Sequence, residues 1–382
     1  MPTQFKAAYT IQWTLSVQHT FAGGWQAQVD YIGNKTTHDP MGTPLSPATF
    51  IPGVWGAGGT GCTGIVTTGP AAVKPGAAGT NCSTTGNQNS RLALTIANPT
   101  QGNQISGGGA GSNYVNDTGT ANYHGMVATL QHRLSSTFSF LANWTYSKCL
   151  DIADGQGDIA ATLTENPYNP KLDYGPCGFD YRHIENFVVV AKSDFHGFNR
   201  AEKLILNGWE IAPLIHITTG TAVNVTSGQD NSLTEIAQDR PNLVPGVNPY
   251  AEVKFKGGNN TGEANREYLN PAAFAQITVP CNTGTNGAYV ANGCTALGGY
   301  GNIGRNAFRS PPYLQFDSQI SRLFPIHESL TLDLRLEAFN VLNHPDFGNP
   351  TASLTSSTFG QIGGTASGNQ ARVFQGGIKL SF

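Results

Sequence analysis

Three aspartates close together in the sequence are the clearest candidate ligands for a metal ion. Asp151, Asp154 and Asp158 lie in one glycine-containing stretch. Carboxylate oxygens suit a hard cation such as Ca²⁺, which takes several oxygen ligands at once. The spacing differs from that of an EF-hand loop, so a solvated loop is the favoured interpretation and Ca²⁺ binding is the alternative.

Other ionisable residues could belong to a polar binding surface or could simply pair with one another. The stretch 179–183 contains Asp180, Arg182 and His183, and its place just before an extended segment favours a structural motif over acid–base chemistry. Two further groups share the polar face of extended segments: Glu210 with His216, and Asp333 with Arg335 and Glu337. Each group fits either a lumen that contacts a solute or ion pairs between neighbouring strands. We favour ion pairs for the second group.

Motifs of the common enzymes are missing from the sequence. It contains no Gly-x-Ser-x-Gly, P-loop, His-Glu-x-x-His or dinucleotide fingerprint. We therefore expect a protein that is not an enzyme and that holds no cofactor.

The six cysteines fall into three pairs that are local in the sequence. Disulfides persist outside the cytoplasm, so local pairing indicates an exported protein. Unpaired buried thiols are the alternative, and metal ligation is disfavoured because no Cys-x-x-Cys or nearby Cys/His cluster occurs. The expected bonds join Cys62 to Cys82, Cys149 to Cys177 and Cys281 to Cys294.

The composition excludes several classes of protein. Only 12% of the 382 residues are charged and the net charge is −3, without a dense basic run, so a nucleic-acid partner is not expected. No apolar run reaches about 18 residues, which excludes a helical membrane span. The start also lacks a signal peptide. For an exported protein, this predicts that the sequence begins inside a longer chain.

Strict alternation of apolar and polar residues defines the elements that must position these groups. In 329–342, for example, Leu332, Leu334 and Leu336 alternate with Asp333 and Arg335. Such a two-residue period predicts strands with one apolar and one polar face. About nine segments show it: 9–18, 25–31, 121–134, 137–148, 184–196, 204–219, 313–324, 329–342 and 373–382.

Short and long connections alternate between these segments. The short ones lie near Phe21, Ser135, 198–202 and 325–328, and the long ones are 36–120, 151–183, 220–312 and 343–370. This places every short turn at one end of an antiparallel sheet and every long loop at the other. The sequence therefore predicts an all-β fold, a transmembrane antiparallel β-barrel whose long loops are external. Lipid would contact the apolar face, and water would fill the lumen.

Several stretches resemble the C-terminal barrel of TonB-dependent outer-membrane receptors, in particular the Oar-like group. They are 9–18, 29–35, 179–183, 207–209, 301–305, 337–345 and the terminal strand. The end of the chain is also similar to the barrel-assembly signal of such proteins, with Gln375, Gly377, Leu380 and Phe382 at its positions.

The resemblance implies a barrel of 22 strands with a plug domain inside it and an N-terminal segment that contacts TonB. About nine strands then make residues 1–382 an incomplete, C-terminal barrel segment that lacks the plug. The implied location is the cell outer membrane. The implied partners are outer-membrane lipid, the barrel-assembly machinery, TonB through the missing N-terminal part, and a small-molecule ligand.

The implied function is active uptake of a small solute, which could be a siderophore, a peptide or an oligosaccharide. The alternatives are a passive porin or surface adhesin barrel, a soluble disulfide-stapled β-sandwich that binds glycans, and an outer-membrane hydrolase. The hydrolase lacks a recognisable nucleophile–base pair.

Overall fold

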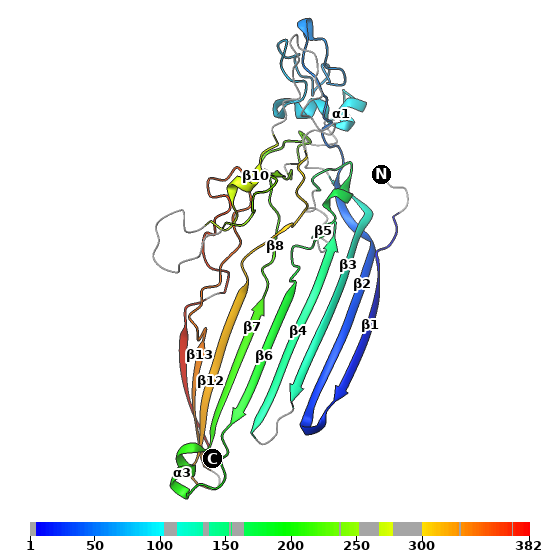
Figure 1. The fold of residues 1–382 in the computed structure, drawn as a ribbon. Coiled ribbons are helices and arrows are strands. Elements are labelled where there is room, and N and C mark those ends of the chain that lie inside the picture. The colour runs from blue at the N-terminus through cyan, green and yellow to red at the C-terminus, as the bar shows by residue number, and fades with distance from the viewer. Residues whose placement is uncertain are drawn as a thin grey trace.

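A computed structural model describes residues 5–102, 113–132, 137–152, 154, 164–236, 238–251, 267–277, 300–327, 330–368 and 370–382. Its main feature is one long, twisted antiparallel sheet below a mass of folded loops (Figure 1). We call the sheet the wall and the loops the cap. None of the described helices is long and apolar enough to cross a membrane.

The wall follows the order of the chain. Each strand pairs with the next, and the short β5 (Gly175–Pro176) adds to the end of β4. All pairings are antiparallel. The strands are β1 (Tyr9–Thr20), β2 (Trp25–Pro44), β3 (Asn113–His132), β4 (Phe138–Asp151), β6 (His183–Lys192), β7 (Trp209–Thr218), β12 (Tyr313–Pro325), β13 (Thr331–Phe339) and β14 (Val373–Ser381).

The short connections lie at the lower end of the wall and the long ones at the upper end (Figure 1). The tightest turn is the 3-10 helix Ala22–Gly24 between β1 and β2, where Gly23 and Gly24 have φ of 78° and 82°. This left-handed backbone is accessible to glycine at little cost. Ser135 and Ser136, the expected turn after β3, lie outside the described residues.

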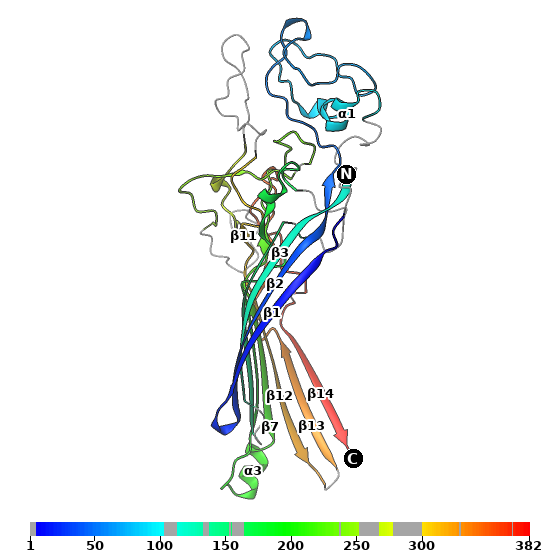
Figure 2. The same cartoon turned by 90° about the vertical axis from the view of Figure 1, so that its right-hand side faces the viewer.

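The wall is curved but open. β1 and β14 are the two edge strands of the sheet, and they do not pair with each other in the described part of the chain (Figure 2). This agrees with the expectation of about nine barrel strands.

Cross-strand register makes the two faces continuous. On the polar face, Gln18, Gln28, Thr129, Asn143, Asn186, His216 and Gln315 form one row across seven strands. The other face carries rows such as Ile211, Ile320 and Leu336, which are 47%, 40% and 47% exposed. So many large exposed apolar side chains on one face require apolar surroundings.

The cap contains its own small apolar clusters. One joins Val225, Leu269, Phe274, Phe308 and Phe359, and the second surrounds Trp55. Short pairs of strands, β8 (Ala222–Val223) with β11 (Phe308–Arg309) and β9 (Asn242–Leu243) with β10 (Phe274–Ala275), frame the first cluster. The helical elements of the cap are brief: α1 (Ala93–Ala97) and the 3-10 helices Ala57–Gly59, Thr85–Arg91, Pro170–Asp173 and Pro271–Ala273.

Some element boundaries differ from the prediction. β2 and β3 continue to Pro44 and from Asn113, so their connection is 45–112 rather than 36–120. Residues 204–206, expected in a strand, belong to the helix α3 (Arg200–Leu206) in the turn between β6 and β7. Asn199 and Glu202 form a capping box there, which favours a helix start over a strand.

Candidate functional site

A cavity of about 620 Å³ lies on the polar face of the wall, where β6, β7 and β12 enter the cap. It is lined by hydroxyl, aromatic and amide side chains, with one imidazole. They are Tyr181, His216, Thr218, Thr219, Thr221, Ser310, Tyr313, Phe347, Asn349 and Ser367, and Ile184, Pro311, Ala366 and two glycines complete the lining. No Lys, Arg, Asp or Glu is among the described lining residues, so the cavity suits an uncharged polar molecule.

The lower side of the cavity continues the polar row of the wall. The Nδ1 of His216 on β7 lies 2.7 Å from the Oδ1 of Asn186 on β6. The imidazole also packs edge-on against the ring of Tyr313, with centroids 6.0 Å apart. The hydroxyl of Tyr313 donates to the Oε1 of Gln315 at 3.0 Å. Hydrogen bonds therefore hold both rings in fixed orientations at the mouth of the lumen.

Backbone and hydroxyl contacts fix the upper side. The Oγ1 of Thr219 accepts from the backbone N–H groups of Arg182 and His183 at 2.9 and 3.2 Å. The Oγ1 of Thr221 lies 3.1 Å from the Oγ of Ser310. Gly220 permits this approach, since a Cβ there would lie 1.8 Å from the carbonyl oxygen of Ser310. Three distant parts of the chain thus form one rim.

The stretch 179–183 is structural, as the sequence favoured. Asp180 is buried, accepts from the backbone N–H of Cys149 at 2.7 Å and forms an ion pair with Arg309. Arg182 approaches the same carboxylate at 3.4 Å. The motif therefore fastens β4 and the start of β6 to the cap.

The aspartates that could have bound Ca²⁺ face an arginine instead. Asp151 and Asp154 both form ion pairs with Arg305, the second at 2.7 Å. The Oδ1 of Asp154 also accepts from the backbone N–H of Gly178 at 2.5 Å. Asp158 lies outside the described residues. The described part of the chain contains no group of three or more His, Cys, Asp or Glu residues that could hold a metal.

Five charged residues of the polar face form ion pairs with one another. Lys192 on β6 lies 2.9 Å from Glu210 on β7. Arg335 contacts Asp333 at 3.3 Å and Glu337 at 3.9 Å. These last contacts run along β13, whereas the sequence suggested pairs between neighbouring strands.

Two of the three expected disulfides are present. Cys62–Cys82 and Cys149–Cys177 each have Cα atoms 5.4 Å apart. Cys281 and Cys294 lie outside the described residues. The first bond belongs to the small cluster around Trp55, and the second joins the upper end of β4 to the following connection.

The proposed barrel-assembly residues lie on or just after β14. Gln375 and Gly377 face Glu337 and Arg335 on β13, and Leu380 faces Leu332. Phe382 is 96% exposed. Their role in assembly stays a prediction.

Sequence reasoning identified His216 but missed most of the cavity. Thr219, Thr221 and Ser310 come from opposite ends of the connection between β7 and β12, Asn349 comes from the one between β13 and β14, and the four have no common motif. Their closeness to strand ends could have identified them. Three of these four residues lie within three positions of the end of β7 or the start of β12.

An antiparallel wall with one apolar face, one polar face, short turns at one end and folded loops at the other defines a section of an outer-membrane β-barrel. Residues 1–375 match the model of the outer membrane beta barrel domain, and the chain belongs to that family. Its location is therefore the outer membrane. No curated protein sequence matches the chain.

Solved structures of similar fold include two much longer chains. The outer membrane transporter YddB from Escherichia coli has 8% identity and a TM-score of 0.43, over 99% of this chain and 33% of that one. FpvA of P. aeruginosa, solved with a pyoverdine and iron, has 10% identity and a TM-score of 0.37, over 98% of this chain and 27% of that one. The chain thus spans about a third of their length or less.

Proposed function

We propose that this chain forms part of the wall and external cap of a TonB-dependent receptor that takes up a small, uncharged polar solute. The observation that carries the proposal is the cavity of about 620 Å³ at the junction of the cap and the polar face. Solute that enters through the cap would meet hydroxyl, amide and aromatic groups before it reaches the lumen. Such groups bind a neutral solute by hydrogen bonding and ring stacking.

Binding without chemical change accounts for the cavity better than catalysis. His216 is engaged by the amide of Asn186 and by the ring of Tyr313. A general base that activates a nucleophile also hydrogen-bonds to a hydroxyl or thiol through its other ring nitrogen, and His216 makes no such bond among the described residues. The energy for release into the periplasm would come from TonB, since the outer membrane has no usable gradient of its own.

Uptake by cells that express the full-length receptor tests this proposal. Radiolabelled maltotriose, a neutral tripeptide and a ferric hydroxamate are suitable probes. His216→Phe removes the polar contact with Asn186 but keeps a ring, and it should lower the uptake of the transported probe about tenfold. Gln319→Leu is the matched control, because Gln319 lies on the same face of β12 but nearer the lower end.

Deletion of TonB separates the receptor from a porin. Loss of uptake of the probe supports active transport, whereas unchanged uptake would assign the barrel to passive diffusion. If none of the three probes enters in a manner sensitive to His216→Phe, the cavity is not the solute site.

A further inference from the structure

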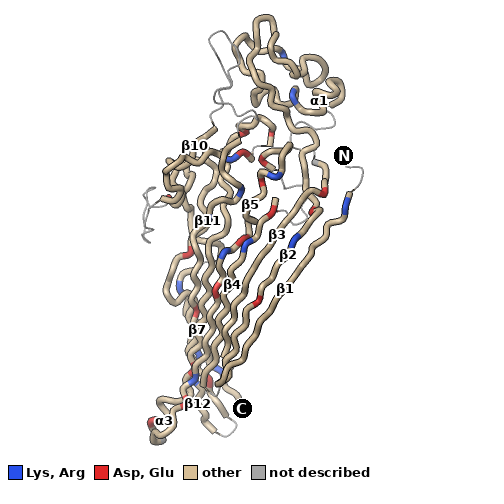
Figure 3. The backbone as a smooth tube through the Cα atoms, turned by 45° about the vertical axis from the view of Figure 1, so that its right-hand side comes forward, with Lys and Arg blue, Asp and Glu red and all other residues tan. Residues whose placement is uncertain are grey.

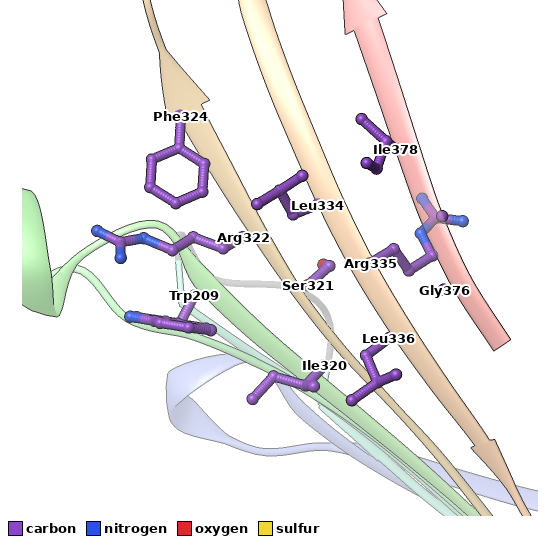
Figure 4. Close-up of a pocket in the computed structure, with 11 residues that line it drawn as sticks. Trp209, Ile320, Ser321, Arg322, Phe324, Leu334, Arg335, Leu336, Gly376 and Ile378 are labelled. Carbon is purple, nitrogen blue, oxygen red and sulfur yellow. The ribbon is translucent and has the colours of Figure 1, made fainter. Parts of the chain in front are cut away.

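A second hollow lies on the opposite, apolar face of the wall, near its lower end. It has a volume of about 530 Å³ and crosses β7, β12, β13 and β14. Its floor is formed by Trp209, Phe324, Leu334, Gly376 and Ile378 (Figure 4). We call it the lower groove. Because it faces away from the lumen, its occupant comes from the membrane.

Arg322 is a cation within this apolar surface. It pairs in register with Trp209 on one side and Leu334 on the other. Its guanidinium carbon lies 4.9 Å from the ring centroid of Trp209 and 4.3 Å from that of Phe324. The two rings hold the planar guanidinium by cation–π contact.

The guanidinium of Arg322 has unused hydrogen-bonding capacity. It donates to the backbone carbonyl of Leu204, but its Nε is buried and has no partner among the described residues. No carboxylate of the described chain forms an ion pair with it. An arginine on a lipid-facing surface is costly unless an anion or water reaches it. The planar fork of a guanidinium suits an anion with several acceptor oxygens, such as a phosphate.

Gly376 gives the lower groove its depth. This residue faces Leu336 across β13 and β14, on a row where a large apolar side chain would be expected. A Cβ built at Gly376 meets no atom within 4 Å, so the space is open. The hollow is largely apolar, which suits an acyl chain. It also lies next to Arg322, which suits a phosphate attached to that chain.

Helix α3 extends the same apolar surface below the wall. Leu204 and Ile205 are each 65% exposed, and the Nε1 of Trp209 donates to the carbonyl of Ile205 at 2.9 Å. A short helix with charged residues at its start and apolar ones at its end, fixed beside an aromatic ring at the end of a barrel wall, is typical of the membrane interface. This end carries the short turns, which places it at the periplasmic leaflet.

We propose that the lower groove binds one glycerophospholipid of the periplasmic leaflet, with its phosphate on Arg322 and one acyl chain along Gly376. The groove is continuous with the lipid-facing wall, and the charge of Arg322 complements that of the phosphate. The site would hold the turn between β6 and β7 at a fixed depth in the membrane.

Native mass spectrometry of the full-length protein in a nonionic detergent tests the proposal, with dioleoyl phosphatidylglycerol as the probe. One lipid should stay bound to the wild-type protein. Arg322→Met keeps the packing of the side-chain stem and should weaken binding about tenfold or more. Arg322→Lys should retain part of the affinity, because it keeps the charge but loses the fork of donors.

Gly376→Leu is an independent variant that fills the groove but leaves Arg322 intact, and it should also weaken binding about tenfold or more. Lys379→Met removes a cation from the polar face of the same strand and should have no effect. The heat-modifiable mobility of each variant in electrophoresis checks that its barrel has folded.

Three outcomes would overturn the proposal. Dioleoylglycerol, which lacks the phosphate, could bind as well as phosphatidylglycerol. Inorganic phosphate alone could displace the lipid at equal concentration, which would indicate a simple anion site. Finally, Gly376→Leu, Arg322→Met and Lys379→Met could all bind lipid equally well.

Discussion

The wall and the cap place their side chains in opposite ways. In the wall, large apolar residues such as Ile211 and Leu336 point outward and stay exposed. In the cap, arginines such as Arg91, Arg240 and Arg305 are buried. Figure 3 shows most charged residues gathered where the strands enter the cap, while long stretches of β1 to β3 carry almost none.

The difference follows from the solvent that each region meets. In lipid, the continuous strand pairing satisfies the backbone, and apolar side chains need no further burial. In water, the connections bury apolar side chains in two small clusters of the described chain, and polar contacts between different connections add to them. Arg240 reaches Glu165 at 2.5 Å and also pairs with Asp173, while Arg91 donates to the carbonyls of Thr49 and Leu233.

Removal of a buried arginine should have the largest effect on the cap. Arg240→Met leaves Glu165 and Asp173 buried without their cation, which should lower the local free energy of opening by about 3–5 kcal/mol. Arg335→Met in the wall breaks exposed contacts and should cost under about 1 kcal/mol. Hydrogen exchange of 164–174 and of β13 measures both. Similar costs would mean that buried pairs do not hold the cap together.

Loss of the disulfide where β4 enters the cap should have the second-largest effect. The Cys149–Cys177 bond closes a loop with a sequence separation of 28. In the chain-entropy model, Cys149→Ser with Cys177→Ser should therefore destabilise the connection after β4 by about 3–4 kcal/mol. Limited proteolysis should detect cleavage within 164–182, while β1 to β3 stay protected. Cleavage that spreads through the wall would show that the two regions unfold together.

Adjacent residues on opposite faces of β7 test the wall itself. Ile211→Arg places a charge in lipid two residues above the interfacial Trp209, and it should cost about 1–2 kcal/mol, less than at the bilayer midplane. Ala212→Arg places the same side chain on the polar face and should be close to neutral. Urea unfolding of the full-length protein in phospholipid vesicles compares the two. Equal costs would contradict the assignment of the lipid face.

Per pH unit, the smallest effect expected is a pH dependence confined to the cap. Burial raises the pKa of Asp239 to about 7, because hydrogen bonds from Ser232 only partly offset the loss of water. A raised pKa means that the folded cap binds a proton that the unfolded chain releases. Cap stability should therefore be greatest below about pH 4 and should fall as the pH rises toward 7, by at most about 1.4 kcal/mol per pH unit.

Hydrogen exchange of 232–243 at several pH values measures this dependence, and Asp239→Asn should remove most of it. Persistence of the slope in that variant would point to other carboxyl groups, of which Glu165 is one, since burial raises its pKa as well.

The alternation of residues predicted the wall well, and the exceptions have a physical reason. β2 and β3 continue beyond their alternating parts to Pro44 and from Asn113, and Met41 and Asn116, which pair there, are both buried. A strand without a lipid-facing side needs no alternation of apolar and polar residues. The alternation along β2 and β3 therefore stops before the strands themselves end. The helix α3 was missed although its capping box, Asn199 and Glu202, is visible in the sequence.

What the sequence determined by itself depends on local geometry. Successive residues of a strand face opposite sides, so the order of Leu332, Asp333 and Leu334 already assigns one side to lipid and the other to the lumen. Cysteines 20 and 28 positions apart can meet through one connection, and both of these pairs do.

Only the tertiary structure decided which connections meet. Arg305 reaches Asp151 across 154 positions, and the cavity on the polar face joins Thr219 and Ser310, 91 positions apart in one connection, with Asn349 from another. The lower groove likewise combines Trp209, Arg322 and Gly376, which lie on three different strands. These contacts follow from the curvature of the wall and the packing of loops above it, which no short spacing in the sequence encodes.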